Sequence, residues 1–178
     1  NKILRIGSWG MVSKRLRKSI NGFDLSQSPS HLLRRCVQYA NDLFSHEPTA
    51  SDLTKQQYTV LVAVEQNEGV SQTDLVTLTG IDRSTLAEMI RRMIEKGLLS
   101  RERTESDQRA NSVRVAPAGR KALRGARAAN DRVEKALLSA LPAADRAKFS
   151  RMLSAIVAAA EAGDTPKPAR RSSGRRQH

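Results

Sequence analysis

Apolar side chains recur at every third or fourth position in six stretches of the chain, and this spacing predicts six helices. The expected helices span residues 29–47, 54–66, 71–79, 82–96, 117–141 and 142–162. Residues 98–103 and 112–116 are instead expected to be strands, with Val113 and Val115 on one face. The pattern therefore predicts a mainly α fold with one small β-hairpin.

Several predicted helices begin with a residue that can accept a hydrogen bond from a free backbone N–H group. The candidates are Ser28 before Pro29, Thr54 with Gln57, Ser71 with Asp74, and Asp82. The first and fifth helices are expected to end before Pro48 and Pro142, because the residue before a proline leaves the helical region.

The third and fourth helices are joined by Thr79-Gly80-Ile81, and a short turn containing Gly between two helices is typical of a helix-turn-helix. The outer face of the fourth helix is polar. Its residues, with Arg83 at its edge, are Arg83, Ser84, Thr85, Glu88, Arg91 and Arg92. The charged hairpin that follows it is typical of a β-wing. Together they predict a winged helix-turn-helix over about residues 53–116.

These residue types match the chemistry of double-stranded DNA. Arginine pairs with a guanine edge, Ser and Thr donate to bases or phosphates, and Glu accepts from a cytosine amine. On the hairpin, Arg101 and Arg103 are candidates for phosphate contact. Arg109 is expected to enter the minor groove, with Asp107 orienting it by a charge-assisted bond.

A plainer interpretation of both segments stays open. The helix face would then be solvated and would carry the ion pairs Glu88–Arg91, Glu88–Arg92 and Arg91–Glu95. The hairpin would be an ordinary charged surface loop with Glu102 and Glu105 beside its arginines.

Residues 29–162 resemble the MarR family of winged-helix regulators. The strongest stretch runs from LTKQQYTVLVAV through GVSQTDLVTLTGIDRSTLAEMIRRMIEKGLLSRERTESDQRANSVRVAPAGRKAL. It includes the KGL strand entry, the Asp107–Arg109 wing tip and Gly119 after the second strand. Ala116-Pro117 departs from the usual Leu-Thr, which alters only a helix cap. The resemblance implies a DNA-binding repressor and the same roles for Asp107 and Arg109.

The segment SPSHLLRRCVQYANDLF is similar to the first helix of family members that regulate aromatic-acid degradation, including those that respond to p-coumaroyl-CoA. An effector that is an aromatic carboxylate or its acyl-CoA thioester is therefore expected. The candidate binding residues are His31, Arg34, Arg35, Tyr39 and Tyr58. Arginines would neutralise a carboxylate or phosphates, and tyrosines would flank a ring. Ordinary surface and core roles are the alternative for each.

The predicted helices 29–47 and 117–162 carry apolar stripes beyond the DNA-reading unit, and such stripes need a partner to pack against. A second copy of the chain is the simplest partner. A two-fold homodimer would present two recognition helices to a pseudo-palindromic site, with half-sites about one DNA turn apart.

The two ends of the chain carry most of its excess positive charge. The net charge is +13, from 31 basic and 18 acidic residues, and eleven of the basic residues lie in residues 1–20 and 166–178. Residues 1–27 are expected to form a basic arm that is partly vector-derived or disordered, and residues 164–178 a basic disordered tail. The MarR-like domain would span residues 28–163. The arms either have no further role or attract phosphates without sequence preference.

The remaining composition argues against other classes of protein. His31, His46 and His178 are scattered and acids are not clustered, so no catalytic or metal site and no cofactor is predicted. The single cysteine, Cys36, excludes an internal disulfide. It is expected to be a small buried hydrophobe, with a redox-sensing repressor as the rival hypothesis. No apolar run is long enough to span a membrane, and a bacterial or archaeal cytoplasm is expected. A DNA-binding architectural protein without an effector is a further alternative.

Overall fold

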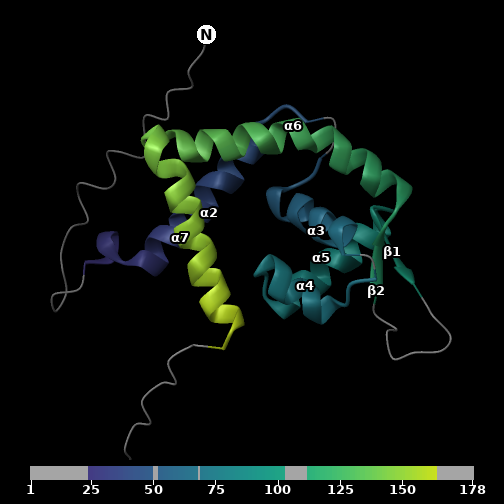
Figure 1. Cartoon of the computed structure of the whole chain (residues 1–178). Coiled ribbons are helices and arrows are strands. Elements are labelled where there is room, and N and C mark those ends of the chain that lie inside the picture. The colour runs from purple at the N-terminus through teal and green to yellow at the C-terminus, as the bar shows by residue number, and fades with distance from the viewer. Residues whose placement is uncertain (1–23, 50–51, 68, 103–111, 164–178) are drawn as a thin grey trace, which may run out of the picture. The chain divides into compact units, whose positions relative to one another are not determined.

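The computed structural model describes residues 24–49, 52–67, 69–102 and 112–163 (Figure 1). In chain order the elements are η1 (Leu25–Gln27), α2 (Pro29–Ser45), α3 (Lys55–Gln66), α4 (Gln72–Thr79), α5 (Arg83–Glu95), β1 (Leu99–Glu102), β2 (Ser112–Val115), α6 (Pro117–Ser139) and α7 (Ala143–Glu161). The predicted class, mainly α with one small sheet, is confirmed. The chain forms two compact units, which divide after Leu137.

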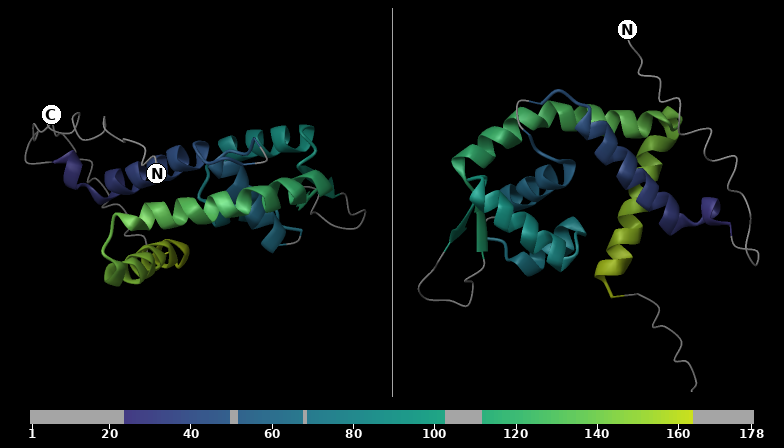
Figure 2. Two further views of the ribbon diagram at one scale, coloured as in Figure 1. Left: turned by 90° about the horizontal axis from the view of Figure 1, so that it is seen from above. Right: turned by 180° about the vertical axis from the view of Figure 1, so that it is seen from behind.

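The two strands form an antiparallel pair that closes one side of the helix-turn-helix. Leu99 lies opposite Val115, and Arg101 lies opposite Val113. The loop before α4 adds to the edge of this pair, because the Val113 N–H donates to the Val70 carbonyl oxygen at 3.3 Å. Both views in Figure 2 show α3, α4 and α5 gathered beside β1 and β2.

The core of this unit is formed by apolar residues from α3, α4, α5 and the strands. Its fully buried members include Leu61, Leu75, Leu86, Ile90, Met93, Leu99 and Val113. On α3, Val60 is also fully buried and Val62 is half-buried. The reason is that α3 contacts α2, α4 and β2 and so buries more than one face.

Three of the four predicted capping residues accept the expected hydrogen bond. Thr54 and Gln57 form a complete capping box, and Ser71 and Asp82 cap α4 and α5. Ser28 occupies the N-cap position of α2, but its side chain makes no capping bond and lies 3.2 Å from the Ser30 hydroxyl. Pro29 at the first helical position has no N–H to satisfy, so the cap is less needed there.

Helix α6 begins against the strand pair and is then tied to α3 and α2. At its start the Ala116 N–H donates to the Leu98 carbonyl oxygen at 3.0 Å. Further along, the Lys55 ammonium of α3 donates to Asn130 and to Glu134. Arg132 donates to Glu47 at 2.7 Å, just beyond α2.

Helix α2 leaves most of its apolar stripe exposed within one chain. Only Ala40 and Phe44 are buried, whereas Leu32 and Val37 are exposed. Cys36 is also exposed, so the expectation of a buried hydrophobe is wrong for the single chain. Phe44, near the end of α2, packs on Tyr58 of α3, whereas the earlier large apolar side chains of α2 are exposed in the part of the chain that the structure describes.

Helix α7 has no buried residue. Its apolar stripe includes Met152, Ile156 and Val157, each more than half exposed. The stripe predicted from the sequence therefore exists as an uncovered face of this helix. Among the helices that the structure describes, none combines the length and the apolar character needed to cross a bilayer.

Replacement of Gly119 by Ala tests the contact between α6 and β1. A Cβ atom at this position would lie 2.0 Å from the Leu98 carbonyl oxygen, so the backbone must shift. We expect Gly119→Ala to lower the free energy of unfolding by about 1–3 kcal/mol, as overpacking does elsewhere. Urea denaturation of the purified protein measures this difference.

Gly125 supplies the matched control because it lies exposed in the same helix. Gly125→Ala should raise stability by about 0.5–1 kcal/mol, since alanine loses less backbone entropy on folding. If both substitutions changed the free energy of unfolding by the same amount, the close approach of Gly119 to Leu98 would not contribute to stability.

Candidate nucleic-acid interface

The turn between α4 and α5 has the geometry of a helix-turn-helix. Gly80 ends α4 in the left-handed conformation with a φ of 66°, which favours glycine. The Thr79 hydroxyl donates to the Leu75 carbonyl oxygen and accepts from the Ile81 N–H. Asp82 then caps α5. The turn is thus fixed by local hydrogen bonds that the sequence TGID encodes.

The two helices are also joined through side chains. The Arg83 guanidinium of α5 donates from Nη2 to the Thr73 hydroxyl of α4 at 3.1 Å. This bond spans ten residues of sequence and joins the first turns of the two helices at their exposed side. Arg83, which was predicted to contact DNA, therefore also has a structural role.

Helix α5 presents a polar face to solvent. Leu86, Ile90 and Met93 are buried on its inner side. The predicted DNA-reading residues all lie on exposed positions: Arg83, Ser84, Thr85, Glu88, Arg91 and Arg92. Because one face of the helix is anchored in the core, these side chains project outward as a set.

The outer face carries the three intrahelical ion pairs that the sequence suggested. Arg91 donates from Nε and Nη2 to the two carboxylate oxygens of Glu88, at 2.9 and 2.7 Å. Arg92 Nε donates to the same carboxylate at 2.7 Å, and Arg91 Nη1 donates to Glu95. The ion pairs of the solvated-face interpretation are therefore present, and DNA reading by the same side chains stays a prediction.

These contacts shift the acidity of the groups involved. Hydrogen bonds from Arg91 and then Arg92 lower the pKa of Glu88 to about 2. The hydrogen bonds with Glu88 raise the pKa of Arg91. Hydrogen bonds from Thr85 and then Ser84 lower the pKa of Asp82 to about 2. All of these groups therefore carry their full charge at neutral pH.

The base of the wing presents arginines outward. Arg101 is exposed on β1, as predicted. Arg114 is exposed on β2 opposite Ser100, and the sequence interpretation did not single it out. Its place between the inward Val113 and Val115 is the signal that could have identified it. Arg103, Asp107 and Arg109 lie outside the described residues.

A cavity of about 520 Å³ lies beside the first turns of α4 and α5 and was not predicted from the sequence. Its lining includes the side chains of Ser71, Thr73, Asp74, Arg83 and Ser112. Val76, Leu86 and Ala87 also line it, so the lining is mixed polar and apolar, and through Arg83 it adjoins the exposed face of α5. Among the described residues there is no group of three metal-ligating side chains.

The five candidate effector residues lie on two helices and are not brought together in one chain. His31, Arg34, Arg35 and Tyr39 lie on α2, and Tyr58 is buried in α3. Tyr58 packs on Phe44, with 5.8 Å between ring centroids. Phe44 is 13 residues along α2 from His31, and at 1.5 Å per residue this separation is roughly 20 Å.

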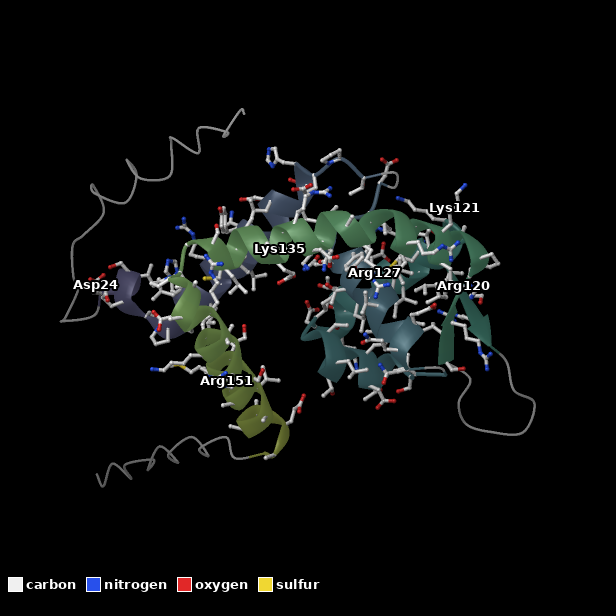
Figure 3. The ribbon with its side chains drawn as sticks, turned by 45° about the horizontal axis from the view of Figure 1, so that its top comes forward. Asp24, Arg120, Lys121, Arg127, Lys135 and Arg151 are labelled. Carbon is white, nitrogen blue, oxygen red and sulfur yellow. The ribbon has the colours of Figure 1, made fainter. Side chains whose placement is uncertain are left out.

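Burial and then the Asp131 charge raise the pKa of Tyr58, while the Arg127 charge opposes them. Arg127 lies on the side of α6 that faces the DNA-reading helices, whereas Arg120 lies where α6 meets β2 (Figure 3). Sequence reasoning did not select Arg127, because α6 carries several other cations. The cations that the structure shows near Tyr58 are Lys55 of α3, whose Nζ lies 5.7 Å from the ring centroid, and Arg127 of α6.

Comparison with known proteins identifies the family to which this chain belongs. Residues 51–110 match the model of the MarR family. The chain is 33% identical over 123 residues to the transcriptional regulator HosA of Escherichia coli, and the match covers 69% of this chain and 90% of HosA. This chain belongs to the MarR family. It is accordingly a winged-helix transcriptional regulator.

Solved structures of the family share the fold. The PcaV transcriptional regulator of Streptomyces coelicolor, in complex with its natural ligand, has a TM-score of 0.67 and 30% identity, covering 79% of this chain and 99% of PcaV. BpsR of Bordetella bronchiseptica, whose DNA binding is regulated by 6-hydroxynicotinic acid, has a TM-score of 0.63 and 28% identity, covering 71% of this chain and 96% of BpsR. The family resemblance seen in the sequence is thus confirmed.

The charge on Asp82 predicts a pH dependence of this regulator's stability. Because the folded-state pKa of about 2 lies below the ordinary value of 3.8, the stabilisation is present above about pH 4 and is lost as pH falls toward 2. The melting temperature of Asp82→Ala should be below that of the wild type at pH 7, and the difference should shrink between pH 4 and pH 2.

Asp82→Asn is the control, since asparagine caps a helix without a charge. Its advantage over Asp82→Ala should persist at low pH. If the difference in melting temperature between the wild type and Asp82→Ala stayed constant down to pH 2, the carboxylate charge would not stabilise α5.

Proposed function

We propose that this MarR-family regulator is a repressor that binds a pseudo-palindromic DNA site as a homodimer and releases it on binding an aromatic carboxylate or its CoA thioester. The observation that carries the DNA-binding part is the outward polar face of α5. Opposite that face, three buried residues anchor α5 in the core, and the Arg83–Thr73 hydrogen bond joins its first turn to α4. A rigid helix with such a face fits the major groove.

The wing contributes contacts beside the groove in this proposal. Arg101 and Arg103 bind phosphates, and Arg109 enters the minor groove with Asp107 orienting its guanidinium. The exposed position of Arg101 on β1 supports the first of these roles. Residues 53–116 would form the DNA-reading unit within a domain of residues 28–163, with residues 1–27 and 164–178 as basic arms.

Dimerisation is proposed through helices 29–47 and 117–162. Each contains large apolar side chains that the single chain leaves exposed, such as Leu32 and Val37 on α2 and Ile156 on α7. Burying such faces against a second copy removes apolar area from water. The same burial would enclose Cys36, which is exposed in one chain.

Ile156→Glu tests this interface, because a carboxylate placed in an apolar contact must be desolvated. Sedimentation at micromolar concentration should show a dimer for the wild type and mainly monomer for the variant. Ser154→Glu, on the same helix but off the apolar stripe, should remain dimeric. A wild-type chain that sediments as a monomer would rule out the model of two half-sites.

The effector part of the proposal rests on the first helix and on the relatives. The BpsR comparison names an aromatic acid as a regulator of DNA binding, and the PcaV comparison includes a natural ligand. Arg34 is exposed on α2 and is available to an anion. His31, Arg35, Tyr39 and Tyr58 complete the proposed site, with α2 residues and Tyr58 meeting across the dimer.

A release assay tests the effector class. A labelled duplex enriched from random DNA by the wild-type protein is titrated with p-coumarate and with p-coumaroyl-CoA. Arg34→Ala or Arg35→Ala should weaken the ligand's effect about 10- to 150-fold, as expected for one lost charged hydrogen bond of about 1.5–3 kcal/mol. Affinity for DNA without ligand should stay nearly unchanged, and Arg124→Ala, an exposed arginine of α6, is the matched control.

The two ligands separate the accounts of the site. Release by the thioester alone supports contacts between the arginines and the CoA phosphates, and release only by the free acid contradicts them.

The exposure of Cys36 favours a second candidate, a thiol-based redox repressor. Release only by peroxide, lost in Cys36→Ser, would establish that function. Release by none of these would favour an architectural DNA-binding protein. We place the regulator, without cofactor or catalysis, in the bacterial cytoplasm.

A further inference from the structure

We propose that Arg92 is the residue of α5 that recognises guanine, that Glu88 is the positioning residue that orients it, and that Arg91 is a supporting residue. This assignment rests on the proposed function, in which α5 enters the major groove. It divides among three residues a role that the sequence assigned equally to all of them.

All three nitrogen atoms of the Arg91 guanidinium already donate hydrogen bonds within α5. Nε and Nη2 form a two-point contact with the Glu88 carboxylate, and Nη1 donates to Glu95 one turn further on. A guanine edge is recognised by two N–H groups of one arginine that lie in a common plane. Arg91 would have to break these contacts to offer such a pair.

Arg92 is held differently. Its Nε donates to Glu88, and its two terminal amino groups have no hydrogen-bond partner among the described residues. The side chain is 64% exposed. The guanidinium is therefore fixed at one end and open at the other. Two terminal amino groups presented together match the O6 and N7 acceptors of guanine.

Glu88 holds the Nε end of the Arg92 guanidinium. Its carboxylate accepts two hydrogen bonds from Arg91 and one from Arg92, so both oxygens are occupied. The sequence suggested that Glu88 accepts from a cytosine amine, but these bonds leave little of the carboxylate free for a base. An acid on a DNA-facing surface repels phosphate unless it serves a neighbouring cation, and here it serves two.

The spacing explains why one carboxylate can hold both arginines. Arg91 lies three residues and Arg92 four residues after Glu88, so both side chains lie on the next turn of the same face. The two arginines with Glu88 and Glu95 sum to zero charge. This part of α5 therefore adds little general attraction for phosphate, and its contribution is expected in the choice of base.

Selection from a random-sequence duplex library tests the assignment. The wild-type protein, Arg92→Ala, Arg92→Lys and Arg91→Ala are each used to enrich binding sites. The wild type should prefer a G·C pair at one position of each half-site, and both Arg92 variants should lose that preference by about 10- to 100-fold. Arg91→Ala removes the same side chain one position away and should keep the preference within a few fold.

Chemical substitution of the DNA identifies the contacted atom. Replacing the selected guanine by 7-deazaguanine removes the N7 acceptor and should weaken wild-type binding, but it should not weaken the already reduced binding of Arg92→Ala. Additive losses, or retention of the guanine preference in Arg92→Ala, would overturn the assignment. Loss of that preference in Arg91→Ala alone would transfer the reading role to Arg91.

Glu88→Ala separates positioning from a merely structural effect. Binding to non-specific duplex should become several-fold tighter, because one negative charge near the phosphates is removed. The preference for guanine should fall at the same time, because Arg92 loses its anchor. A damaged helix would weaken both kinds of binding, and an unchanged preference would contradict the positioning role.

Failure of the proposed function gives a different result. A wild-type protein that enriches no sequence would overturn the proposed DNA-reading function together with this assignment. A wild type that enriches a half-site whose preferences do not depend on Arg92 would overturn the assignment alone.

Discussion

Burial of one face of α5 is the constraint on which the rest of this molecule depends. Leu86, Ile90 and Met93 lie almost fully inside the core, and each large apolar side chain buried in this way contributes about 1.5–3 kcal/mol. A rotation of the helix by one residue, 100°, would expose all three. This anchoring fixes which side chains face solvent. The ion pairs on the outer face are weaker by comparison because water screens them, so they orient side chains but do not hold the helix.

The core that holds α5 also positions the elements around it. Met93 and Leu99 continue the apolar surface from α5 into the strand pair, and Gly119 allows α6 to start directly on Leu98. Through Lys55, the middle of α6 is then fixed to α3. A ligand bound near α2 and α6 would act through these contacts. It would favour whichever arrangement of α6 and the DNA-reading unit binds it better.

Much of the fold could be predicted because local rules and tertiary packing agree. The capping residues Thr54, Ser71 and Asp82, the left-handed Gly80 and the alternating Val113 and Val115 all act within a few residues of sequence. The polar face of α5 followed from helical periodicity alone. The exposure of Cys36 could not be predicted, because an apolar stripe does not reveal which of its residues are covered within the same chain.

The sequence by itself determined the helices, the strand pair, the outward residues of α5 and the family, because each depends on local spacing and on motifs in order. Only the tertiary structure decided which hydrogen bonds the outward residues of α5 form. Glu88, Arg91 and Arg92 are all exposed on α5, yet the hydrogen bonds leave one arginine open and occupy the other. Likewise only the tertiary structure shows that Tyr58 packs on Phe44, with Lys55 and Arg127 as nearby charges. Which atoms meet depends on the packing of segments distant in sequence and on side-chain conformation, and periodicity carries no information about either.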